Sequence, residues 1–491
     1  MGQRHFDPWV IAAVAVGLAL RFVNLGAAAL WFDETFTFGH VLVPWSELPG
    51  RVAADNQAPI YYATLKAWTE VAGLSPFALR VPGVLASAAC IPLIAAIARI
   101  LAGDRVARTA AWLAAISPFL IQHAQDARPY ALLSMFAMAD LLLLVRFVTG
   151  RSRRLGVLWV AGAIAVVATH YYGIFLLAGE GLALLLLRPR PIAAWLPAGA
   201  VAGAACSAIV LAAARASRVV FGGDYAFGGT ALPGVVWSML TGYTLMPSSE
   251  ELHTLGAQAI LPYLPMALAA LPAFAIVAVA GLRALTIPAR VLLLTAFGVA
   301  LLTPFLYRLV AGAGVHPRYF AAAFAPLLIV VAAGMAPDEL RSVRGGATVV
   351  LAIVMAWATV RHLADTDHGR EDVYAAGRWL DANVPPDEEI LITSDEMERL
   401  ARFHWPERHF RSYPAERRAV TTANVPALVE ALPFGGRERA IFLFGRAWLS
   451  DPDGELRRAL AARYPRCPGT AVPGIDILCF RPLGAAPQAA S

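Results

Sequence analysis

The sequence predicts a polytopic α-helical membrane protein with about eleven transmembrane helices and a C-terminal α/β domain outside the cytoplasm. Hydrophobic residues make up 58% of the 491 residues and charged residues only 15%, against about 25% in an ordinary soluble domain. Apolar runs of about 20 residues, the length of a membrane span, recur throughout residues 1–364. In residues 365–491, by contrast, Arg, Asp and Glu occur at the density of a soluble domain, which places the domain boundary there.

The apolar runs locate the predicted spans in order along the chain. A helix needs about 20 apolar residues to cross the hydrocarbon core, and the run at 174–188 is the shortest of the candidates. The expected spans are 9–28, 79–99, 106–123, 130–148, 155–174, 174–188, 192–214, 260–282, 289–310, 319–336 and 346–363.

Arginine is distributed unevenly between the connections, and this predicts the orientation. Short loops rich in Lys or Arg stay in the cytoplasm. The N-terminus is therefore expected inside, and an odd number of spans places the C-terminal domain outside. The positive net charge is thus explained by topology and does not indicate nucleic-acid binding. The connections expected in the cytoplasm contain Arg4; Arg99, Arg105 and Arg108; Arg146, Arg151, Arg153 and Arg154; Arg188 and Arg190; Arg283 and Arg290; Arg341 and Arg344.

Two of the connections expected outside are long, residues 29–78 and 215–258. Loops of this length usually carry function or form short helices of their own. We expect interfacial helices at 33–42 and 58–73, which are rich in Trp, Tyr and Phe, because these residues favour the membrane–water boundary. Function is therefore expected on the outer face.

The C-terminal region alternates between helical and strand patterns. Residues 371–383 have helical periodicity, and 389–393 has the composition of a strand. Cys467 and Cys479 could form a disulfide if the domain lies in an oxidising compartment, whereas Cys90 and Cys206 lie in apolar runs and are expected to be packing residues. We also expect helices at 395–403, 423–431 and 453–463, strands at 439–445 and 475–481, and disorder at 484–491.

Two adjacent carboxylates, Asp33 and Glu34, follow the first predicted span. Ionisable residues near the ends of spans are costly, which makes them functional candidates. Asp33 could act as a general base, with Glu34 as a second polar contact. The alternative is a helix N-terminus, where acidic residues are favourable.

Two arginines in outer connections are candidates for binding phosphate: Arg128 in QDARPY and Arg318 in HPRY. Guanidinium donors match phosphate oxygens in geometry. Asp126 and His316 each precede one of these arginines by two residues and are further candidates. The alternatives are a local pair between Asp126 and Arg128, and an Arg318 side chain that snorkels to the interface.

Polar aromatic residues and one lysine complete the outer candidates. His170 and Tyr171, at the end of the fifth predicted span, could hydrogen-bond a sugar or a phosphate, or belong to an aromatic belt. Tyr61 and Lys66 lie in the second predicted interfacial helix, where Lys66 shares a face with Tyr62 and could contact substrate charge.

Asp140 and Glu180 lie deeper, within predicted spans. A proton relay is one interpretation, and a buried structural role is the other. The sequence contains no Walker loop, no dinucleotide-binding fingerprint after a strand and no zinc motif.

The order of these motifs resembles a known family. The chain contains LWFDE, QAPIYYATLKAW, SPFLIQHAQDARPYALL, THYYGIFLLAGE and HPRYFAAAFAPLL in that order. Over most of residues 1–335 it is similar to the bacterial membrane glycosyltransferases of family 39 type, which have the GT-C fold and include protein O-mannosyltransferases and lipid A aminoarabinose transferases. The segment EDVYAAGRWLDANVPPDEEILI resembles the soluble end of many bacterial members.

The resemblance implies transfer of a sugar from a polyprenyl-phosphate donor to an acceptor hydroxyl on the outer face of the bacterial inner membrane, with inversion. It implies that Asp33 is the general base, that Glu34 is the acidic residue following it, and that Arg128 or Arg318 holds the donor phosphate. Where many relatives have His-Pro-Pro this chain has Gln57-Ala58-Pro59, and Lys66 stands where many have His. These departures concern the donor or acceptor and leave the class unchanged.

The expected partners are the polyprenyl-phosphate sugar, membrane lipid and an acceptor lipid, glycan or protein, with no nucleic acid. No cofactor is required, although a divalent metal such as Mg or Mn could assist the phosphate. A transporter or flippase of lipid-linked sugars is the main alternative, and inverted repeats with matching broken spans would favour it. A non-catalytic membrane scaffold is a second.

Overall fold

The chain divides into two compact units, which are described separately. The first contains Met1–Gly26, Thr37–Leu245 and Leu264–Ala364, and the second contains Ala27–Phe36, Met246–Tyr263 and Asp365–Ser491. The second unit therefore joins the predicted C-terminal domain to parts of both long outer loops. The computed structural model of the chain describes residues 7–150, 152–189, 192–216, 231–248, 251–252, 255–311, 316–335, 342–365, 370–414, 420–434, 437–447, 450–451 and 453–483.

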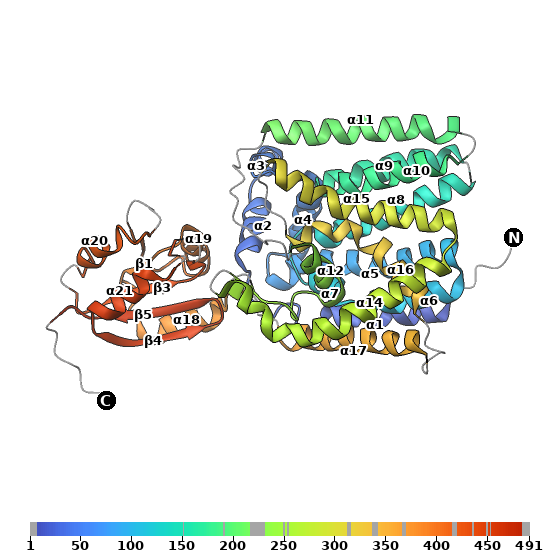
Figure 1. Cartoon of the computed structure of the whole chain (residues 1–491). Coiled ribbons are helices and arrows are strands. Elements are labelled where there is room, and N and C mark those ends of the chain that lie inside the picture. Colours follow the sequence, from blue (N-terminus) through green and yellow to red (C-terminus); the bar gives the residue numbers. More distant parts are fainter. Residues whose placement is uncertain are drawn as a thin grey trace. The chain divides into compact units, whose positions relative to one another are not determined.

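The first unit is a bundle of helices (Figure 1). Every predicted span coincides with one helix or with two consecutive helices. The helices are α1 (Pro8–Phe22), α5 (Pro76–Ala102), α6 (Asp104–Ala115), α7 (Pro118–Ala124), α8 (Tyr130–Gly150), α9 (Arg153–Thr169), α10 (Gly173–Leu187), α11 (Ile192–Ala216), α14 (Leu264–Ala284), α15 (Ile287–Ala311), α16 (Phe324–Gly334) and α17 (Val343–Ala364).

Among the described residues, seven helical segments are long and apolar enough to cross a membrane: Pro76–Ala102, Tyr130–Gly150, Trp195–Ala216, Gly256–Ala284, Ile287–Tyr307, Pro317–Gly334 and Val343–Ala364. The other predicted spans fall on α1, α9 and α10, which are shorter, and on the pair α6 and α7. The single span expected at 106–123 is interrupted because Ser117 caps a new helix, accepting from the Leu120 amide at 3.2 Å, and Pro118 occupies its first position.

Shorter helices occupy the predicted outer connections. The expected helices at 33–42 and 58–73 are present as α2 (Phe32–Leu42) and α4 (Pro59–Ala72). Three further elements were not expected in these loops: α3 (Leu48–Ala54), α12 (Ala231–Thr241) and the 3-10 helix η1 (Gly256–Tyr263). A second 3-10 helix, η2 (Pro317–Ala323), precedes α16. Residues 217–230 of the predicted loop 215–258 and the predicted disordered end at 484–491 lie outside the described residues.

A buried arginine ties α1 to its neighbours. Arg21 is fully buried, and its guanidinium donates to the Ser87 hydroxyl at 2.8 Å and to the carbonyls of Gly17, Ala115 and Ala114 at 2.7, 3.0 and 3.0 Å. A charge in an apolar interior is tolerated only when its donors are satisfied in this way. Arg21 is therefore a structural residue that joins α1 to α5 and α6.

Helices α14 and α16 cross at two glycines. A Cβ at Gly281 would lie 1.9 Å from the Val330 carbonyl oxygen, and one at Gly334 would lie 1.8 Å from that of Val277. Only glycine permits backbones to approach so closely, and small residues commonly form such contacts between membrane helices.

The second unit contains a five-stranded sheet of order β2-β1-β3-β5-β4 (Figure 1). Strand β1 pairs in parallel with β2 and β3, and β5 pairs antiparallel with β3 and β4. The expected elements are all present: α18 (Val373–Asn383), β1 (Ile390–Ile392), α19 (Asp395–His404), α20 (Val425–Glu430), β3 (Ala440–Phe444), α21 (Glu455–Arg463) and β5 (Ile475–Phe480). Strands β2 (Phe410–Ser412) and β4 (Arg466–Val472) were not expected.

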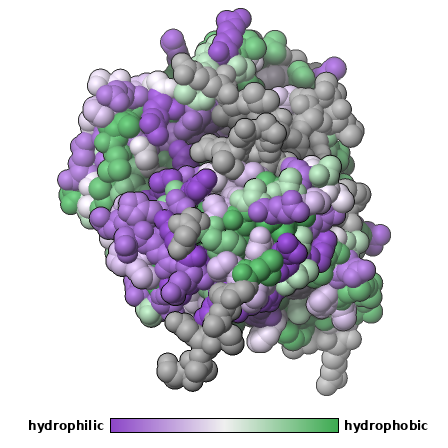
Figure 2. Space-filling model, turned by 90° about the vertical axis from the view of Figure 1, so that its left-hand side faces the viewer, coloured by the Kyte–Doolittle hydropathy of each residue, from purple (hydrophilic) through white to green (hydrophobic). Residues whose placement is uncertain are grey.

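Helices cover both faces of this sheet, which confirms the predicted α/β architecture. Successive strand residues point to opposite faces. Ile390 and Ile392 pack with residues of α18 and α19, whereas Leu391 packs with residues of α20 and α21. The two hydrophobic cores, one on each face of the sheet, contain no charged side chain among the described residues. Figure 2 shows broad hydrophilic areas on the face of the molecule turned to the viewer.

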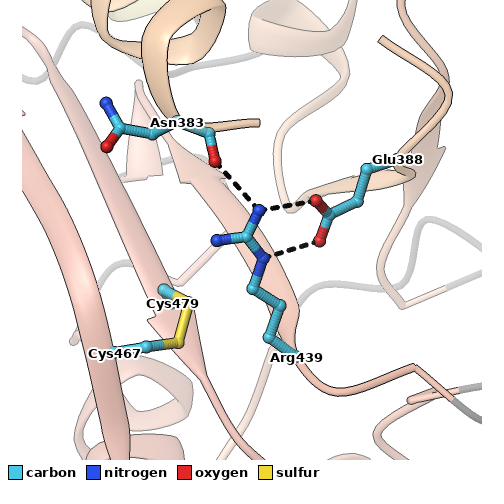
Figure 3. Close-up of a disulfide and its surroundings, with 5 residues drawn as sticks. All are labelled: Asn383, Glu388, Arg439, Cys467 and Cys479. Atoms are coloured by element: carbon cyan, nitrogen blue, oxygen red, sulfur yellow. Dashed lines mark hydrogen bonds and ion pairs between the residues drawn. A yellow bond between two sulfur atoms is a disulfide. The ribbon is translucent and has the colours of Figure 1, made fainter. Parts of the chain in front are cut away.

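A disulfide joins the last two strands of the sheet. Cys467 on β4 and Cys479 on β5 are bonded, with Cα atoms 5.0 Å apart, and they are register partners (Figure 3). Nearby, Arg439 donates to both carboxylate oxygens of Glu388 at 2.9 and 2.7 Å and to the Asn383 carbonyl at 2.9 Å. Cys90 and Cys206 are free and buried, as expected.

Reduction of this disulfide should destabilise the C-terminal domain, because the bond closes a loop whose ends are 12 residues apart and so restricts the unfolded chain. We expect a loss of about 3 kcal/mol, measured as a lower thermal midpoint of the purified chain in dithiothreitol. The double variant Cys467→Ala/Cys479→Ala is the control, and its midpoint should not respond to dithiothreitol. An equal response of both proteins would contradict a stabilising role for the bond.

Candidate active site

The acidic pair lies in the first turn of α2, in the part assigned to the second unit. Glu34 is completely buried, and its side chain accepts a hydrogen bond from the Trp31 amide at 3.3 Å. This contact satisfies one of the free amides at the helix N-terminus, as the glutamate of a capping box does. The capping function that the sequence suggested for Asp33 is therefore performed by Glu34, while Asp33 is only partly buried.

Three arginines of the C-terminal domain contact the aromatic residues around the acidic pair. The guanidinium carbon of Arg370 lies 5.6 Å from the Trp31 ring centre. The corresponding distances are 4.5 Å from Arg446 to Phe32 and 3.7 Å from Arg399 to Phe36. Each contact falls within the range of a cation–π interaction, about 6 Å. We call Arg370, Arg399 and Arg446 the arginine clamp.

Arg446 is the most constrained member of the clamp. It is 9% exposed and forms ion pairs with Glu371 at 2.8 Å and with Glu396 at 2.5 Å. Its φ angle is 52°, in the left-handed region that residues other than glycine rarely adopt. Such a conformation persists only where surrounding contacts hold it. The contacts of Arg446 with two carboxylates and with Phe32 supply that constraint.

Asp33 belongs to the charge network around Arg446. Burial raises the pKa of Glu396 above its usual range, Arg446 opposes this shift, and the negative charge of Asp33 adds to it. The two carboxylates are therefore near enough for their charges to interact. A further contact to the same segment is made by the His404 ring, whose Nε2 lies 2.8 Å from the Leu30 carbonyl oxygen.

In the first unit, Arg128 is held by hydroxyl groups from two helices. Its Nη1 donates to the Thr37 hydroxyl at 3.3 Å and to the Tyr62 hydroxyl at 3.4 Å. Tyr62 in turn donates to the Gln57 side chain at 3.0 Å, and Tyr171 donates to the Gln57 carbonyl at 2.8 Å. Helices α2 and α4 and the turn after α9 thus position the guanidinium.

Arg318 meets the same region from another part of the chain. Its guanidinium carbon lies 5.8 Å from the ring centres of both Tyr130 and Tyr319. The His170 ring lies 5.6 Å from that of Tyr130 and 5.9 Å from that of Tyr319. The charges of Arg128 and Arg318 both act on His170. We call Arg128, Arg318, His170, Tyr130 and Tyr319 the basic–aromatic cluster.

One polar residue beside this cluster was missed by the sequence analysis. Tyr243 packs edge-on against His316, with ring centres 5.6 Å apart, and against His123 at 6.0 Å. Its hydroxyl is buried, and the described residues offer it no hydrogen-bond partner. Tyr243 lies in the predicted loop 215–258, where no motif distinguished it from other aromatic residues.

The remaining candidates lie apart from the basic–aromatic cluster or have local contacts. Lys66 donates to the Val41 carbonyl at 3.1 Å and lies 5.3 Å from the Trp45 ring centre, so it takes part in packing α4. Tyr61 is buried and packs edge-on against Tyr62. The Asp126 carbonyl accepts from the Arg128 amide at 2.7 Å and shapes that turn.

Two acidic residues lie deep within the first unit. Asp140 and Glu180 are completely buried within α8 and α10, and a Cβ at Gly162 would lie 2.6 Å from the Asp140 carboxylate. Within the described ranges, no group of three or more His, Cys, Asp or Glu side chains is arranged to hold a metal ion.

Comparison with known proteins gives one family match by sequence. Residues 56–214 match the family model described as dolichyl-phosphate-mannose-protein mannosyltransferase. This region includes Arg128, Tyr130 and His170. No curated protein matches the chain.

The chain is also similar to solved structures. The crystal structure of ArnT from Cupriavidus metallidurans bound to undecaprenyl phosphate has 15% identity and a TM-score of 0.50, with coverage of 98% of this chain and 99% of that chain. The archaeal oligosaccharyltransferase AglB from Archaeoglobus fulgidus, in complex with an inhibitory peptide and a dolichol-phosphate, has 13% identity and a TM-score of 0.52, with coverage of 96% and 74%. A crystal structure of the Archaeoglobus fulgidus oligosaccharyltransferase tethered with an acceptor peptide has 11% identity and a TM-score of 0.53, with coverage of 97% and 75%.

The variant Arg446→Ala should loosen the segment around Asp33, because it leaves Glu371 and Glu396 without their common partner. Removal of one partner from a buried ion pair costs about 3 kcal/mol. We expect faster amide exchange in residues 27–36 and a lower thermal midpoint.

The matched control is Arg457→Ala, which breaks a more exposed pair with Asp476 and should cost less than about 1 kcal/mol. Equal effects of the two variants on exchange in residues 27–36 would argue against the clamp.

Acidification should destabilise the domain that contains His404, because the charged ring would be buried. Burial lowers the pKa of His404, although the bond to the Leu30 carbonyl opposes this shift. A lowered pKa means that the stability contributed by the neutral ring is present above the usual value of about 6.5 and is lost as the pH falls towards the lowered value. The thermal midpoint should therefore fall less between pH 7 and pH 5 in His404→Gln than in the native chain. A larger fall in the variant would reverse this assignment.

Proposed function

Because the chain has the GT-C fold of membrane glycosyltransferases, which its sequence resembles, we propose that it transfers a sugar from a polyprenyl-phosphate donor to an acceptor hydroxyl on the outer face of the bacterial inner membrane. The observation that carries the proposal is the geometry around Tyr130: the Arg318 guanidinium and the His170 ring both lie beside its ring, and Arg128 precedes it by two residues. These residues come from three separate connections between helices. Two of the similar structures hold a polyprenyl or dolichol phosphate, which is consistent with such a donor.

The arginines would bind the donor phosphate and stabilise it as it leaves. When the sugar–oxygen bond breaks, the lipid phosphate gains negative charge, and fixed guanidinium groups oppose that charge in a site poor in water. Arg128 is oriented by hydroxyl groups and Arg318 by aromatic faces, so both are held before the donor arrives. No nucleotide-binding loop is required for this chemistry.

Asp33 would act as the general base. It would accept the proton of the acceptor hydroxyl as that oxygen attacks the anomeric carbon, and the phosphate would depart from the opposite face, which gives inversion. A base within hydrogen-bond reach contributes about 10²- to 10⁴-fold in rate. The arginine clamp would hold the segment that carries Asp33, while Glu34 secures the helix start by its bond to Trp31.

Neutral polar groups would contact the sugar. The buried Tyr243 hydroxyl is available to a sugar hydroxyl, and His170 and His316 pack against the surrounding tyrosines. Tyr61, Tyr171 and Lys66 contribute to the shape of α4 and its surroundings and would act on the donor indirectly. A divalent metal such as Mg or Mn could assist the phosphate in this proposal.

The disulfide supports an outer location for the C-terminal domain. Disulfides persist in oxidising compartments such as the bacterial periplasm. We therefore propose that the N-terminus is cytoplasmic and that the second unit is periplasmic. The acceptor, whether lipid, glycan or protein, would approach from that side.

The variant Asp33→Asn should abolish transfer while preserving folding. We expect a fall in kcat of about 10²- to 10⁴-fold, measured as release of free lipid phosphate from a panel of polyprenyl-phosphate sugars. Glu47→Gln is the control. It removes the same charge from the residue that precedes α3 and should retain activity. Full activity of Asp33→Asn would remove Asp33 from the base role.

The variants Arg128→Ala and Arg318→Ala should raise the KM for the donor more than that for the acceptor. A hydrogen bond to a charged group contributes about 1.5–3 kcal/mol, so each KM should rise by about tenfold or more. Arg283→Ala, at the end of α14, serves as the control. An unchanged KM for the donor in both variants would mean that the donor phosphate binds elsewhere. Movement of a lipid-linked sugar across the membrane without sugar transfer would instead favour a flippase.

A further inference from the structure

A groove on the first unit lies between α9 and α11, two helices that run side by side (Figure 1). Its volume is about 650 Å³, which falls within the range of about 300–1,000 Å³ found for ligand sites. Apolar residues line most of it: Phe147, Gly156, Val157, Val160, Ala161, Ile164, Pro197, Ala198 and Val201. Among the described residues that line it, Arg153 is the charged one.

Small residues create the groove. Gly156 has no side chain, and a Cβ there would lie 2.9 Å from the Phe147 ring, so α8 and α9 pack closely at this point. Ala161 and Ala198 leave further space between the two helices, and Pro197 lies inside α11. The rim is exposed and apolar, with Val157 64% and Val201 59% accessible. In a membrane this surface faces lipid tails.

Arg153 marks one end of the groove. It is the first residue of α9, where the partial positive charge of the helix also favours an anion. The described residues provide Arg153 with no hydrogen-bond or ion-pair partner. The donor-site residue His170 lies at the other end of the same helix, which has 17 residues and is therefore about 25 Å long. The groove follows α9 from Arg153 to Ile164, so its charged end is the end far from the basic–aromatic cluster.

We propose that the groove binds one anionic phospholipid of the leaflet opposite to the donor. An apolar trough that ends in an unpaired arginine matches a lipid with an acyl chain and a phosphate headgroup that carries net negative charge, such as phosphatidylglycerol. Basic pockets between transmembrane helices on the cytoplasmic side are a recognised way of binding anionic headgroups. Arg153 belongs to the connections whose arginine content predicts that side. The bound lipid would fill the space between α9 and α11.

The experiment is native mass spectrometry of the full chain in detergent with added palmitoyl-oleoyl phosphatidylglycerol. Arg153→Gln should weaken binding about fivefold, the contribution of one arginine near an anionic lipid headgroup. Arg154→Gln is the matched control, because Arg154 is the neighbouring arginine, equally exposed, and does not line the groove. Equal behaviour of the two variants would overturn the proposal.

A second pair of variants tests the acyl-chain part of the groove. Ala198→Trp should fill it and remove the bound lipid, whereas Ala212→Trp, about four turns further along α11 and outside the groove, should not. Phosphatidylcholine should bind about fivefold more weakly than phosphatidylglycerol. If Ala198→Trp binds lipid as the native chain does, or if both phospholipids bind equally, the bound lipid is nonspecific and the proposal is overturned. Displacement by equimolar undecaprenyl phosphate would instead assign the groove to the donor carrier and overturn the proposal.

Discussion

The structure depends on one constraint: a charge placed in an apolar interior must be compensated by fixed partners. The chain meets this constraint in different ways, and the difference separates structural arginines from candidate functional ones. Arg21 directs four of its five N–H donors to one hydroxyl and three carbonyls, and it is fully buried. The Arg128 guanidinium, by contrast, donates to two side-chain hydroxyl groups, those of Thr37 and Tyr62, which fix its direction.

The same constraint explains why the C-terminal domain contacts the acidic segment. A helix that starts with Asp33 and Glu34 would repel other carboxylates, yet Glu371 and Glu396 lie in the same unit. Arg446 compensates these two glutamates and also covers the Phe32 ring. The C-terminal domain therefore contacts a segment rich in aromatic and acidic residues through its arginines.

Most of the fold could be predicted from the sequence, because the spacing of apolar residues and the length of apolar runs are local properties of the chain. The spans at 79–99 and 130–148 coincide with α5 and α8, and the helices and strands expected in the C-terminal domain are present. Elements that lack a local signal were missed. Strand β2 has three residues, and β4 contains Pro468 and Gly469, which are typical of an edge strand. The interruption between α6 and α7 depends on a serine cap followed by proline, which hydropathy alone does not detect.

The candidate site was only partly predictable, because its motifs are local and its geometry is not. Asp33, Arg128 and Arg318 stood out as charges next to apolar runs. Arg446 did not, since it is one of many arginines in a soluble region, and its contacts come from residues 371, 396 and 32. Tyr243 was missed for the same reason: its neighbours His123 and His316 are distant in the sequence.

Helix α2 shows how the two kinds of contact combine. Its first turn is secured by Glu34, by Phe32 against Arg446 and by the Phe32–Phe36 ring contact at 5.0 Å. Its later turns are secured by Thr37 at Arg128 and by His40, which pairs with Asp55 at 3.1 Å and stacks on Tyr62. A helix of 11 residues is too short to be stable alone in water. Its position, and hence that of Asp33, must therefore be set by these contacts, which makes the residues that touch α2 as important to the proposed chemistry as the carboxylate itself.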